Sequence, residues 1–194
     1  MESVKYIKED DLKRIREVLK YKNKPVILEL INFGVNVALR ISDLQKLKFQ
    51  DITKDNKIIL REQKTGKVRE IQLNNTCVKA VANIKKVYKE LGYPTDKGYL
   101  FKSLYRKYVK EKEDHYITKS GVNDYLAYLK DLLNIDYPIA SHSLRKTWGY
   151  TVYKKTHNIA LVMKALNHTS EAVTLRYIGI EQEQLDDTYL SFEI

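Results

Sequence analysis

The sequence has few residues that cross-link or break a chain: one cysteine, three prolines and seven glycines in 194 residues. Because Cys77 is the single cysteine, an internal disulfide is impossible and a zinc site built from cysteines is excluded. Its neighbours Val78 and Val81 indicate a helix interior, where a free thiol packs as a small hydrophobic group. We therefore expect Cys77 to be structural.

Long apolar segments are also missing. No apolar run approaches the roughly 20 residues that a membrane-spanning helix requires, and the first ten residues, MESVKYIKED, lack the apolar stretch of a signal peptide. We therefore expect a cytoplasmic protein without a membrane partner. Internal repeats, low-complexity segments and a convincing linker are absent as well, so the sequence predicts one domain over residues 1–194.

Acidic residues are outnumbered by basic ones. There are 35 Lys and Arg against 25 Asp and Glu, which gives a formal net charge of +10 spread along the chain. A basic field of this kind favours a polyanion, and nucleic acid or an anionic membrane surface is the usual partner. A lysine-rich solvated surface is the alternative. Charge alone therefore favours DNA or RNA binding but does not establish it.

Apolar periodicity predicts a mainly helical chain. Leu12, Ile15 and Leu19 share one face of the first helix, and residues 42–45 (SDLQ) have the pattern of a capping box that starts a short helix. The predicted helices cover residues 10–21, 27–38, 42–45, 75–91, 118–133, 143–156, 159–166, 170–178 and 182–192.

Two short β-patterned runs, at residues 57–62 and 67–73, interrupt these helices. Between them lies the tripeptide KTG at residues 64–66, whose glycine favours a tight hairpin. Residues 98–101 are compatible with a short strand, and residues 102–116 are ambiguous. The expected fold class is mainly α with a small antiparallel β-sheet (α+β).

Arg145 is the most informative single residue. In its predicted helix, Leu144, Trp148 and Val152 form an apolar stripe, and Arg145 falls at the edge of that stripe. A guanidinium there is costly unless it is paired or binds an anion. His142 lies near the helix N-terminus, where backbone N–H groups favour an anion. The pair could bind one phosphate; the alternative is an arginine satisfied by a carboxylate, with His142 as a cap.

Four other residues have ordinary explanations when each is considered alone. Arg40 is flanked by apolar residues, and Asp43 is close enough to form an ion pair with it. Lys64, at the hairpin, is by default a solvated lysine. His168 lies between two short helices, where a capping histidine is common, and Tyr177 is one of 15 tyrosines. None of these signals is strong singly.

The order of these residues and their local sequences resemble the tyrosine recombinases of the phage integrase family. The resemblance rests on four ordered boxes: ALRISDL at 38–44, QKTGKVR at 63–69, SHSLRKT at 141–147, and LNH at 166–168 followed nine residues after His168 by Tyr177. These boxes span residues 38 to 177, so the resemblance covers nearly the whole chain as the family's catalytic domain.

The resemblance implies a site-specific DNA recombinase. Tyr177 would attack a DNA phosphodiester, forming a 3′-phosphotyrosine and releasing a 5′-hydroxyl, which conserves bond energy for rejoining. Arg40 and Arg145 would bind the phosphate oxygens in bidentate fashion, and His168 would supply another donor. Charge would accumulate on the non-bridging oxygens, where these side chains would stabilise it.

The same resemblance assigns the remaining roles. Lys64 would protonate the leaving 5′-oxygen as a general acid, and His142 would assist as a donor or accept the Tyr177 proton. Asp43 would support the site rather than react. No cofactor and no metal ion is expected, because the basic side chains would do the electrostatic work that Mg²⁺ does in other enzymes.

The implied partner is double-stranded DNA, with a homotetramer on synapsed DNA and a monomer or weak dimer when free. Leu185, Tyr189 and Phe192 form an apolar stripe, and the resemblance suggests that residues 182–194 dock in a neighbouring protomer. Packing on its own domain is the alternative. Abundant Lys, Ile and Asn are typical of an AT-rich bacterial or phage genome. The resemblance implies that a phage or another mobile element encodes the chain.

Two departures from the family pattern stand out. Asn167 replaces the glycine that usually precedes the second histidine, but Asn tolerates the left-handed conformation better than most residues. The first box begins near residue 40, which leaves no room for the N-terminal core-binding domain. We therefore expect either an excised catalytic domain or a compact member, similar in extent to the small fimbrial-switch invertases.

Three alternatives remain. The same chemistry serves type IB topoisomerases, which relax supercoils without exchanging partners. A non-catalytic DNA-binding protein with this fold is disfavoured because all six reactive residues are present together. An RNA-binding module lacks the support of an RNP-like aromatic motif. The DNA site, and the choice among integration, excision, inversion and resolution, are not encoded in any of these patterns.

Overall fold

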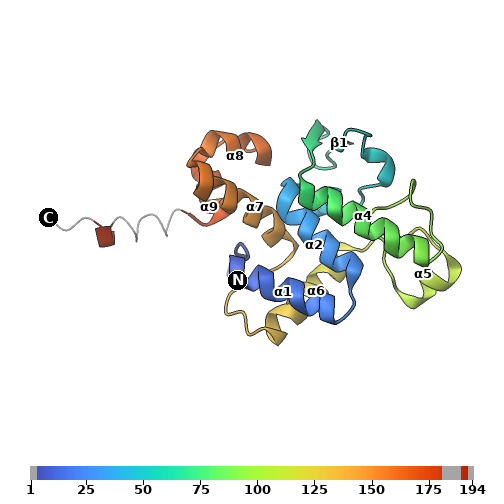
Figure 1. Ribbon diagram of the computed structural model, residues 1–194. Coiled ribbons are helices and arrows are strands. Elements are labelled where there is room, and N and C mark those ends of the chain that lie inside the picture. Colours follow the sequence, from blue (N-terminus) through green and yellow to red (C-terminus); the bar gives the residue numbers. More distant parts are fainter. Residues whose placement is uncertain (1–3, 181–188, 192–194) are drawn as a thin grey trace.

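A computed structural model describes residues 4–180 and 189–191 (Figure 1). Most of the described chain is helical, with one two-stranded antiparallel sheet, so the predicted fold class is confirmed. The main body is built from α1 (Glu9–Tyr21), α2 (Pro25–Val37), α4 (Asn75–Glu90), α6 (Lys119–Leu132) and α7 (Ser141–Thr156).

Helix α2 is the centre of the main body. It begins with Pro25 in the first turn, where a missing N–H costs nothing, and it is followed by Ala38 in the left-handed conformation with φ 53°. Helices α4 and α7 pack against it. Gly34 permits the close crossing with α7, because a Cβ at this position would lie 2.9 Å from the Cδ1 atom of Leu144.

The predicted hairpin is confirmed. Strands β1 (Lys57–Arg61) and β2 (Val68–Gln72) pair antiparallel, with Lys57 opposite Gln72 and Arg61 opposite Val68. Gly66 has φ 67° in the connecting loop, the positive φ that favours glycine. The Gly66 N–H bonds to the Glu62 carbonyl and the Glu62 N–H to the Lys67 carbonyl, which closes the loop at residues 62–67.

Two local predictions are wrong. The N-cap of the short helix α3 (Ile41–Leu44) is Arg40, two residues before Ser42, the N-cap that the capping box predicted, and no side chain caps it. Asp43 instead accepts a hydrogen bond from the backbone N–H of Gln63, and the Ser42 carbonyl accepts one from the Gln63 side chain. Ser42 therefore lies inside the helix, where the Gln45 N–H bonds to the Ile41 carbonyl and not to the Ser42 side chain.

The segment at residues 98–101 forms no strand, because Tyr99 makes only an isolated bridge, with Lys48. A 3₁₀ turn (Phe49–Asp51) follows Lys48. Within the ambiguous stretch 102–116, residues Arg106–Glu111 form α5. Leu100 is buried and its N–H bonds to the Leu47 carbonyl, so burial orders this segment without sheet pairing.

Helices α8 (Ile159–Leu166) and α9 (Glu171–Ile178) lie beside α7, away from α4 and α5 (Figure 1). Asn158 and Ser170 cap their N-termini by accepting backbone N–H bonds. The two helices have their own small core, separate from the main one, formed by Ala38, Val162, Leu166, Ile178 and Ile180. Most of the predicted helix at 182–192 lies outside the described residues; of it, residues 189–191 are described and helical.

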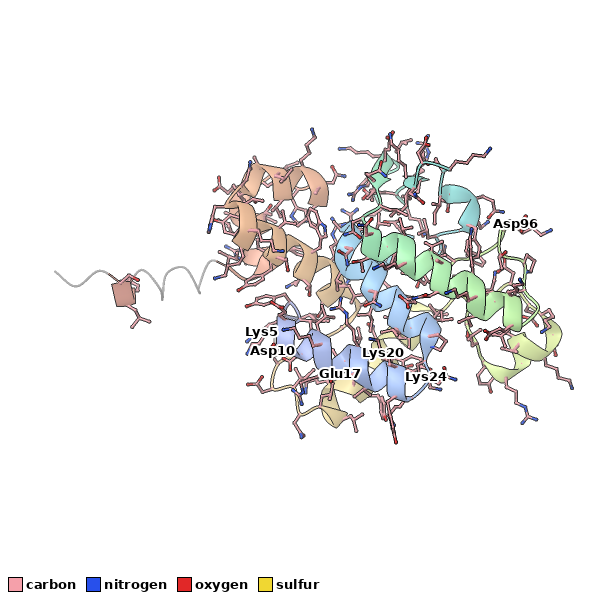
Figure 2. The ribbon with its side chains drawn as sticks, in the orientation of Figure 1. Lys5, Asp10, Glu17, Lys20, Lys24 and Asp96 are labelled. Carbon is pink, nitrogen blue, oxygen red and sulfur yellow. The ribbon has the colours of Figure 1, made fainter. Side chains whose placement is uncertain are left out.

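Charged side chains cover the outer face of α1, where Figure 2 labels Asp10, Glu17 and Lys20. The opposite face carries the predicted stripe of Leu12, Ile15 and Leu19, all buried. Within the described ranges, no helix has the length and apolar character that crossing a bilayer demands.

Cys77 is fully buried in the first turn of α4, and this burial raises the pKa of its thiol to about 12. A thiol with such a pKa is protonated at neutral pH and a poor nucleophile. The prediction that Cys77 is a structural residue is therefore confirmed.

Candidate active site

The six side chains with predicted chemical roles line one open cleft of about 610 Å³. The cleft lies where the α8–α9 unit meets α3, the hairpin loop and the N-terminal end of α7. Segments far apart in the sequence thus converge on one place, and the six residues are Arg40, Lys64, His142, Arg145, His168 and Tyr177.

Arg145 is 2% exposed and joins the two parts of the molecule. Its Nη1 donates to the Ala38 carbonyl at 2.7 Å and its Nη2 to the Leu166 carbonyl at 2.5 Å. These carbonyls lie at the C-terminal ends of α2 and α8, where helix dipoles favour a cation. Burial lowers the pKa of Arg145 to about 10, so it stays charged at neutral pH. The alternative of a carboxylate partner is wrong.

Arg40 precedes α3 and forms an ion pair with Glu62, with 2.9 Å between Nη1 and Oε2. The alternative explanation of Arg40, a local ion pair with Asp43, is therefore wrong. Asp43 is buried behind the cleft, where its Oδ1 accepts the Gln63 N–H at 2.9 Å. Asp43 thus supports the hairpin loop, while Glu62 takes the arginine.

Lys64 is exposed at the tip of the hairpin loop, and its neighbours on both sides are anchored. Gln63 bonds to α3, and the Thr65 hydroxyl donates to Glu62 at 2.7 Å. Lys64 itself forms no hydrogen bond or ion pair with any residue that the structure describes. A tethered loop with a free ammonium group is suited to protonating a ligand in the cleft.

The two histidines line the same cleft, His142 from α7 and His168 from the turn between α8 and α9. His142 is in the first turn of α7, whose N-cap is Ala140, so the capping alternative for His142 is wrong. Desolvation, followed by the charges of Lys119 and Arg145, lowers the pKa of His142, although the residue as a whole remains exposed. Burial, then the charges of Arg145 and Arg40, lowers the pKa of His168.

Tyr177 lies near the end of α9, half-buried at the wall of the cleft. Burial raises the pKa of Tyr177, while the charges of Arg145 and Arg40 and a hydrogen bond with Arg145 lower it. The Lys146 ammonium lies 5.1 Å from the centroid of the Tyr177 ring. Burial is the largest of these effects, so the pKa of Tyr177 lies above its ordinary value, although the cations around the phenol favour its ionised form.

Sequence reasoning missed Gly149, which lets α9 approach α7. A Cβ at Gly149 would lie only 2.7 Å from Cγ2 of Ile178, the residue after Tyr177. It also missed Lys119, which lines the cleft. A glycine in the middle of a predicted helix was the available signal for the first, since such a glycine costs stability unless packing requires it. No local signal marks Lys119.

Glu62 was missed as well. Desolvation alone would raise the pKa of this buried carboxyl, but hydrogen bonds from Thr65 and Arg69 and the charges of Arg40 and Arg69 lower it to about 2. A glutamate between Arg61 and Gln63, two residues before Lys64, was the available signal, although nothing in the sequence told which arginine it would meet.

Cations therefore dominate the cleft, and its chemistry suits an anion such as a phosphodiester. Two arginines and two lysines line it, and the pKa values of both histidines are lowered, mainly by desolvation, which favours their neutral forms. Among residues 4–180 and 189–191, no three or more His, Cys, Asp and Glu side chains are grouped so as to hold a metal ion.

Comparison with known proteins agrees with this geometry. The profile of the phage integrase family matches residues 5–184. The chain is 34% identical over 185 residues to the probable integrase/recombinase YoeC of Bacillus subtilis (strain 168), covering 93% of both. It is 29% identical over 157 residues to tyrosine recombinase XerC of Caldanaerobacter subterraneus subsp. tengcongensis, covering 80% of this chain and 42% of that protein.

Solved structures share the fold. The XerA recombinase aligns with a TM-score of 0.73 at 22% identity, covering 98% of this chain and 66% of that one. The XerH recombinase, in a post-cleavage complex with a palindromic difH substrate, aligns with a TM-score of 0.71 at 19% identity, covering 95% and 52%. The chain thus spans nearly all of YoeC but about half to two thirds of these longer proteins.

Proposed function

This chain belongs to the phage integrase family, and we propose that it is a site-specific DNA strand transferase with Tyr177 as its nucleophile. The observation that carries the proposal is the convergence of Arg40, Lys64, His142, Arg145, His168 and Tyr177 on one cleft. Arg145 and Arg40 also have structural partners, but a cleft lined by six such side chains from four sequence boxes is what binding and cleavage of a common anionic ligand requires.

The proposed cleavage step is an in-line displacement at phosphorus. The Tyr177 hydroxyl oxygen attacks, the bond to the 5′-oxygen breaks, and a 3′-phosphotyrosine and a free 5′-hydroxyl result. His142 takes the proton of the phenol, and Lys64 gives a proton to the departing oxygen. Both proton transfers are reversed when a 5′-hydroxyl attacks the phosphotyrosine, so the same groups rejoin the strand.

The phosphate would be held by the two arginines. Arg145 uses one N–H of Nη1 and one of Nη2 on backbone carbonyls, which fixes its plane and leaves other N–H groups for the non-bridging oxygens. Arg40 is held by a hydrogen bond from its Nη1 to Glu62. His168 would donate to the same phosphate when protonated. With these cations in place, the proposed reaction needs neither a metal ion nor a cofactor.

Trapping on DNA tests the proposal. A pool of nicked duplexes with randomised cores lets the cleaved fragment diffuse away, so the covalent protein–DNA adduct accumulates and is resolved on a denaturing gel. We expect an adduct with the natural chain and none with Tyr177→Phe. Tyr21→Phe is the matched control, because Tyr21 is 91% exposed and distant in sequence from every box. An adduct that persists in Tyr177→Phe would show that another residue is the nucleophile.

Recombination rather than supercoil relaxation is favoured because the known relatives are named integrases and recombinases. A two-site recombination assay beside a relaxation assay with supercoiled plasmid separates the two activities. We expect exchange between two sites that carry the trapped sequence. Relaxation without exchange would instead indicate a topoisomerase.

The proposed working assembly is a homotetramer on two DNA duplexes, with residues 182–194 docking in a neighbouring protomer. Deletion of residues 182–194 should abolish both assembly on DNA and recombination. The melting temperature of the shortened chain should equal that of the natural chain. Light scattering of protein–DNA complexes measures the assembly. A tetramer that forms unchanged without these residues would rule out the docking role.

A further inference from the structure

A single buried carboxylate stands behind the cationic cleft. The Glu62 side chain is 0% exposed, and it lies at the end of β1, where the hairpin loop begins. A buried carboxylate is costly unless charge pairs and hydrogen bonds satisfy it, so its partners show what it is for. The proposed reaction does not use Glu62 as a reactant, and a role for Glu62 in this cleft rests on that proposed function.

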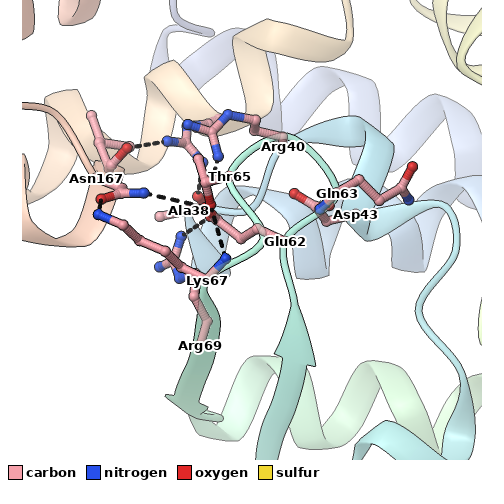
Figure 3. A network of polar contacts seen from close by, with 11 residues as sticks. Ala38, Arg40, Asp43, Glu62, Gln63, Thr65, Lys67, Arg69 and Asn167 are labelled. Carbon is pink, nitrogen blue, oxygen red and sulfur yellow. Dashed lines mark hydrogen bonds and ion pairs between the residues drawn. The ribbon is translucent and has the colours of Figure 1, made fainter.

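Four side chains from three separate parts of the fold converge on Glu62 (Figure 3). Its Oε2 accepts hydrogen bonds from Arg40 Nη1 at 2.9 Å and from the Thr65 hydroxyl at 2.7 Å. Its Oε1 accepts one from Arg69 Nη1 at 3.1 Å. The Asn167 amide donates to Oε2 at 3.4 Å. The start of α3, the hairpin and the α8–α9 turn are therefore joined through one carboxylate.

Asn167 makes this connection with its side chain. Its backbone is left-handed, with φ 52°, a conformation that glycine adopts at least as easily. A glycine there, however, could not reach the hairpin. Asn167 also accepts a hydrogen bond from Lys67 at 3.2 Å, so its amide binds the loop at two points. Asn167, which stands where the family usually has glycine, therefore connects the turn before His168 to the hairpin loop that carries Lys64.

Charge explains why a carboxylate is required. Arg40, Arg69 and Arg145 lie close enough that each affects the ionisation of its neighbours, and Glu62 is the acidic group among them. Without its negative charge, the guanidinium of Arg40 would be repelled and would turn toward solvent. With it, one edge of Arg40 is held and the remaining N–H groups are directed away from Glu62.

We propose that Glu62 is the positioning residue of this cleft: it orients Arg40 for the phosphate and, through Asn167, keeps the turn of His168 in register with the hairpin of Lys64. Glu62 does not touch the DNA in this scheme. Because it is a negative charge near the phosphate site, it weakens binding slightly, and its benefit lies in the geometry of the cleavage step.

The test is Glu62→Gln, which keeps the shape of the side chain and removes its charge. We expect the single-turnover cleavage rate to fall by about 10- to 100-fold, while the affinity for the same duplex at fixed salt is unchanged or tighter. In a double-mutant cycle, Glu62→Gln should cause a much smaller further loss in the Arg40→Ala background than in the natural chain, since its effect through Arg40 is already gone and only the contact with Asn167 remains. A defect that merely unfolds the protein would instead weaken binding and cleavage together.

The matched control is Glu70→Gln, on the neighbouring strand of the same hairpin. Glu70 is half-exposed and pairs with Lys57, so the substitution makes the same change in net charge away from the cleft. Its cleavage rate should equal that of the natural chain. If Glu62→Gln fails to fold, Thr65→Val and Asn167→Gly each remove one partner of Glu62 at accessible positions, and each should slow cleavage by several-fold without loss of binding.

The outcomes separate the two proposals. If the natural chain forms no adduct, the proposed function itself has failed. If the natural chain cleaves DNA and Glu62→Gln, Thr65→Val and Asn167→Gly cleave at the same rate, only the positioning role is overturned. It is also overturned if Glu62→Gln and Arg40→Ala have fully additive effects on the cleavage barrier.

Discussion

The ring of His168 meets the ring of Tyr177 edge-on, with 5.1 Å between the centroids and 90° between the planes. Behind this contact, His168 Nδ1 lies 3.2 Å from the Thr174 hydroxyl, which in turn donates its own hydrogen to the Ser170 carbonyl. The hydroxyl must therefore accept a hydrogen from Nδ1. In the neutral ring this leaves Nε2 as an acceptor, so His168 can donate to a phosphate only when it is protonated.

The first prediction concerns the pH dependence of DNA binding. In the protein without DNA, burial and the nearby arginines lower the pKa of His168, and a bound phosphate should raise this pKa again. Binding then takes up a proton, so affinity should rise by up to about tenfold as pH falls from about 8 to 6. Titrations at constant ionic strength measure this. His168→Gln should remove much of this pH dependence. Thr174→Val should do the same, because without the hydroxyl the neutral ring can carry its proton on Nε2 and donate it to the phosphate. A DNA affinity of the natural chain that does not change with pH would contradict the prediction.

The second prediction concerns Lys64 as the general acid. In a substrate whose bridging 5′-oxygen is replaced by sulfur, the leaving thiolate needs no protonation. Lys64→Ala should slow cleavage of the ordinary duplex by about 100-fold or more and should cleave the sulfur-containing duplex at nearly the rate of the natural chain. Arg145→Ala is the control, because a lost phosphate ligand is not restored by a better leaving group. Equal defects on both substrates would assign Lys64 to phosphate binding.

The third prediction concerns the contact between α7 and α9. Gly149→Ala places a methyl group 2.7 Å from Ile178, so α9 must move and the protein should lose about 1–3 kcal/mol of stability. Because Tyr177 precedes Ile178, adduct formation should slow as well.

Gly121→Ala on α6 provides the comparison for Gly149→Ala. A Cβ at Gly121 meets its nearest neighbour at 3.4 Å, an ordinary contact, so this substitution should raise stability by up to about 1 kcal/mol and leave cleavage unchanged. Urea unfolding monitored by circular dichroism measures both variants. A Gly149→Ala protein as stable and active as the natural chain would show that the two helices can separate freely.

The fourth prediction concerns acid stability. The pKa of Glu62 is about 2 in the folded protein against an ordinary value of 4.5, so the unfolded chain binds the proton more readily. The stabilisation by this carboxylate is therefore complete above about pH 4.5 and is lost as pH falls toward 2. Its size at neutral pH is on the order of 3 kcal/mol.

Urea unfolding at pH 7 and pH 3 tests this dependence. The stability difference between the natural chain and Glu62→Gln should shrink at the lower pH, whereas Glu70→Gln, at a half-exposed ion pair, should change little at either pH. A difference between the natural chain and Glu62→Gln that stays constant from pH 7 to pH 3 would show that Glu62 is not ionised with a lowered pKa.

Local patterns were sufficient for most of the fold. The apolar stripe of Leu12, Ile15 and Leu19, the glycine at the hairpin turn and the left-handed tolerance of Asn167 all act through neighbours within a few residues, and each is confirmed. The capping box at residues 42–45 failed because the helix begins earlier, after Arg40, so the Gln45 N–H bonds to the Ile41 carbonyl and not to the Ser42 side chain. The strand predicted at residues 98–101 is absent because the segment pairs at one isolated bridge, that of Tyr99 with Lys48, and is held by burial of Leu100 and Phe101.

The sequence by itself determined which residues are present and in what order, including Tyr177 nine residues after His168. Only the tertiary structure decided how they are held. Arg145 binds the carbonyl of Ala38, 107 residues away, rather than a carboxylate, and Arg40 turns to Glu62, 22 residues away, rather than to nearby Asp43. Such partners depend on which helix ends and loops the two cores bring together, and no local propensity encodes that choice.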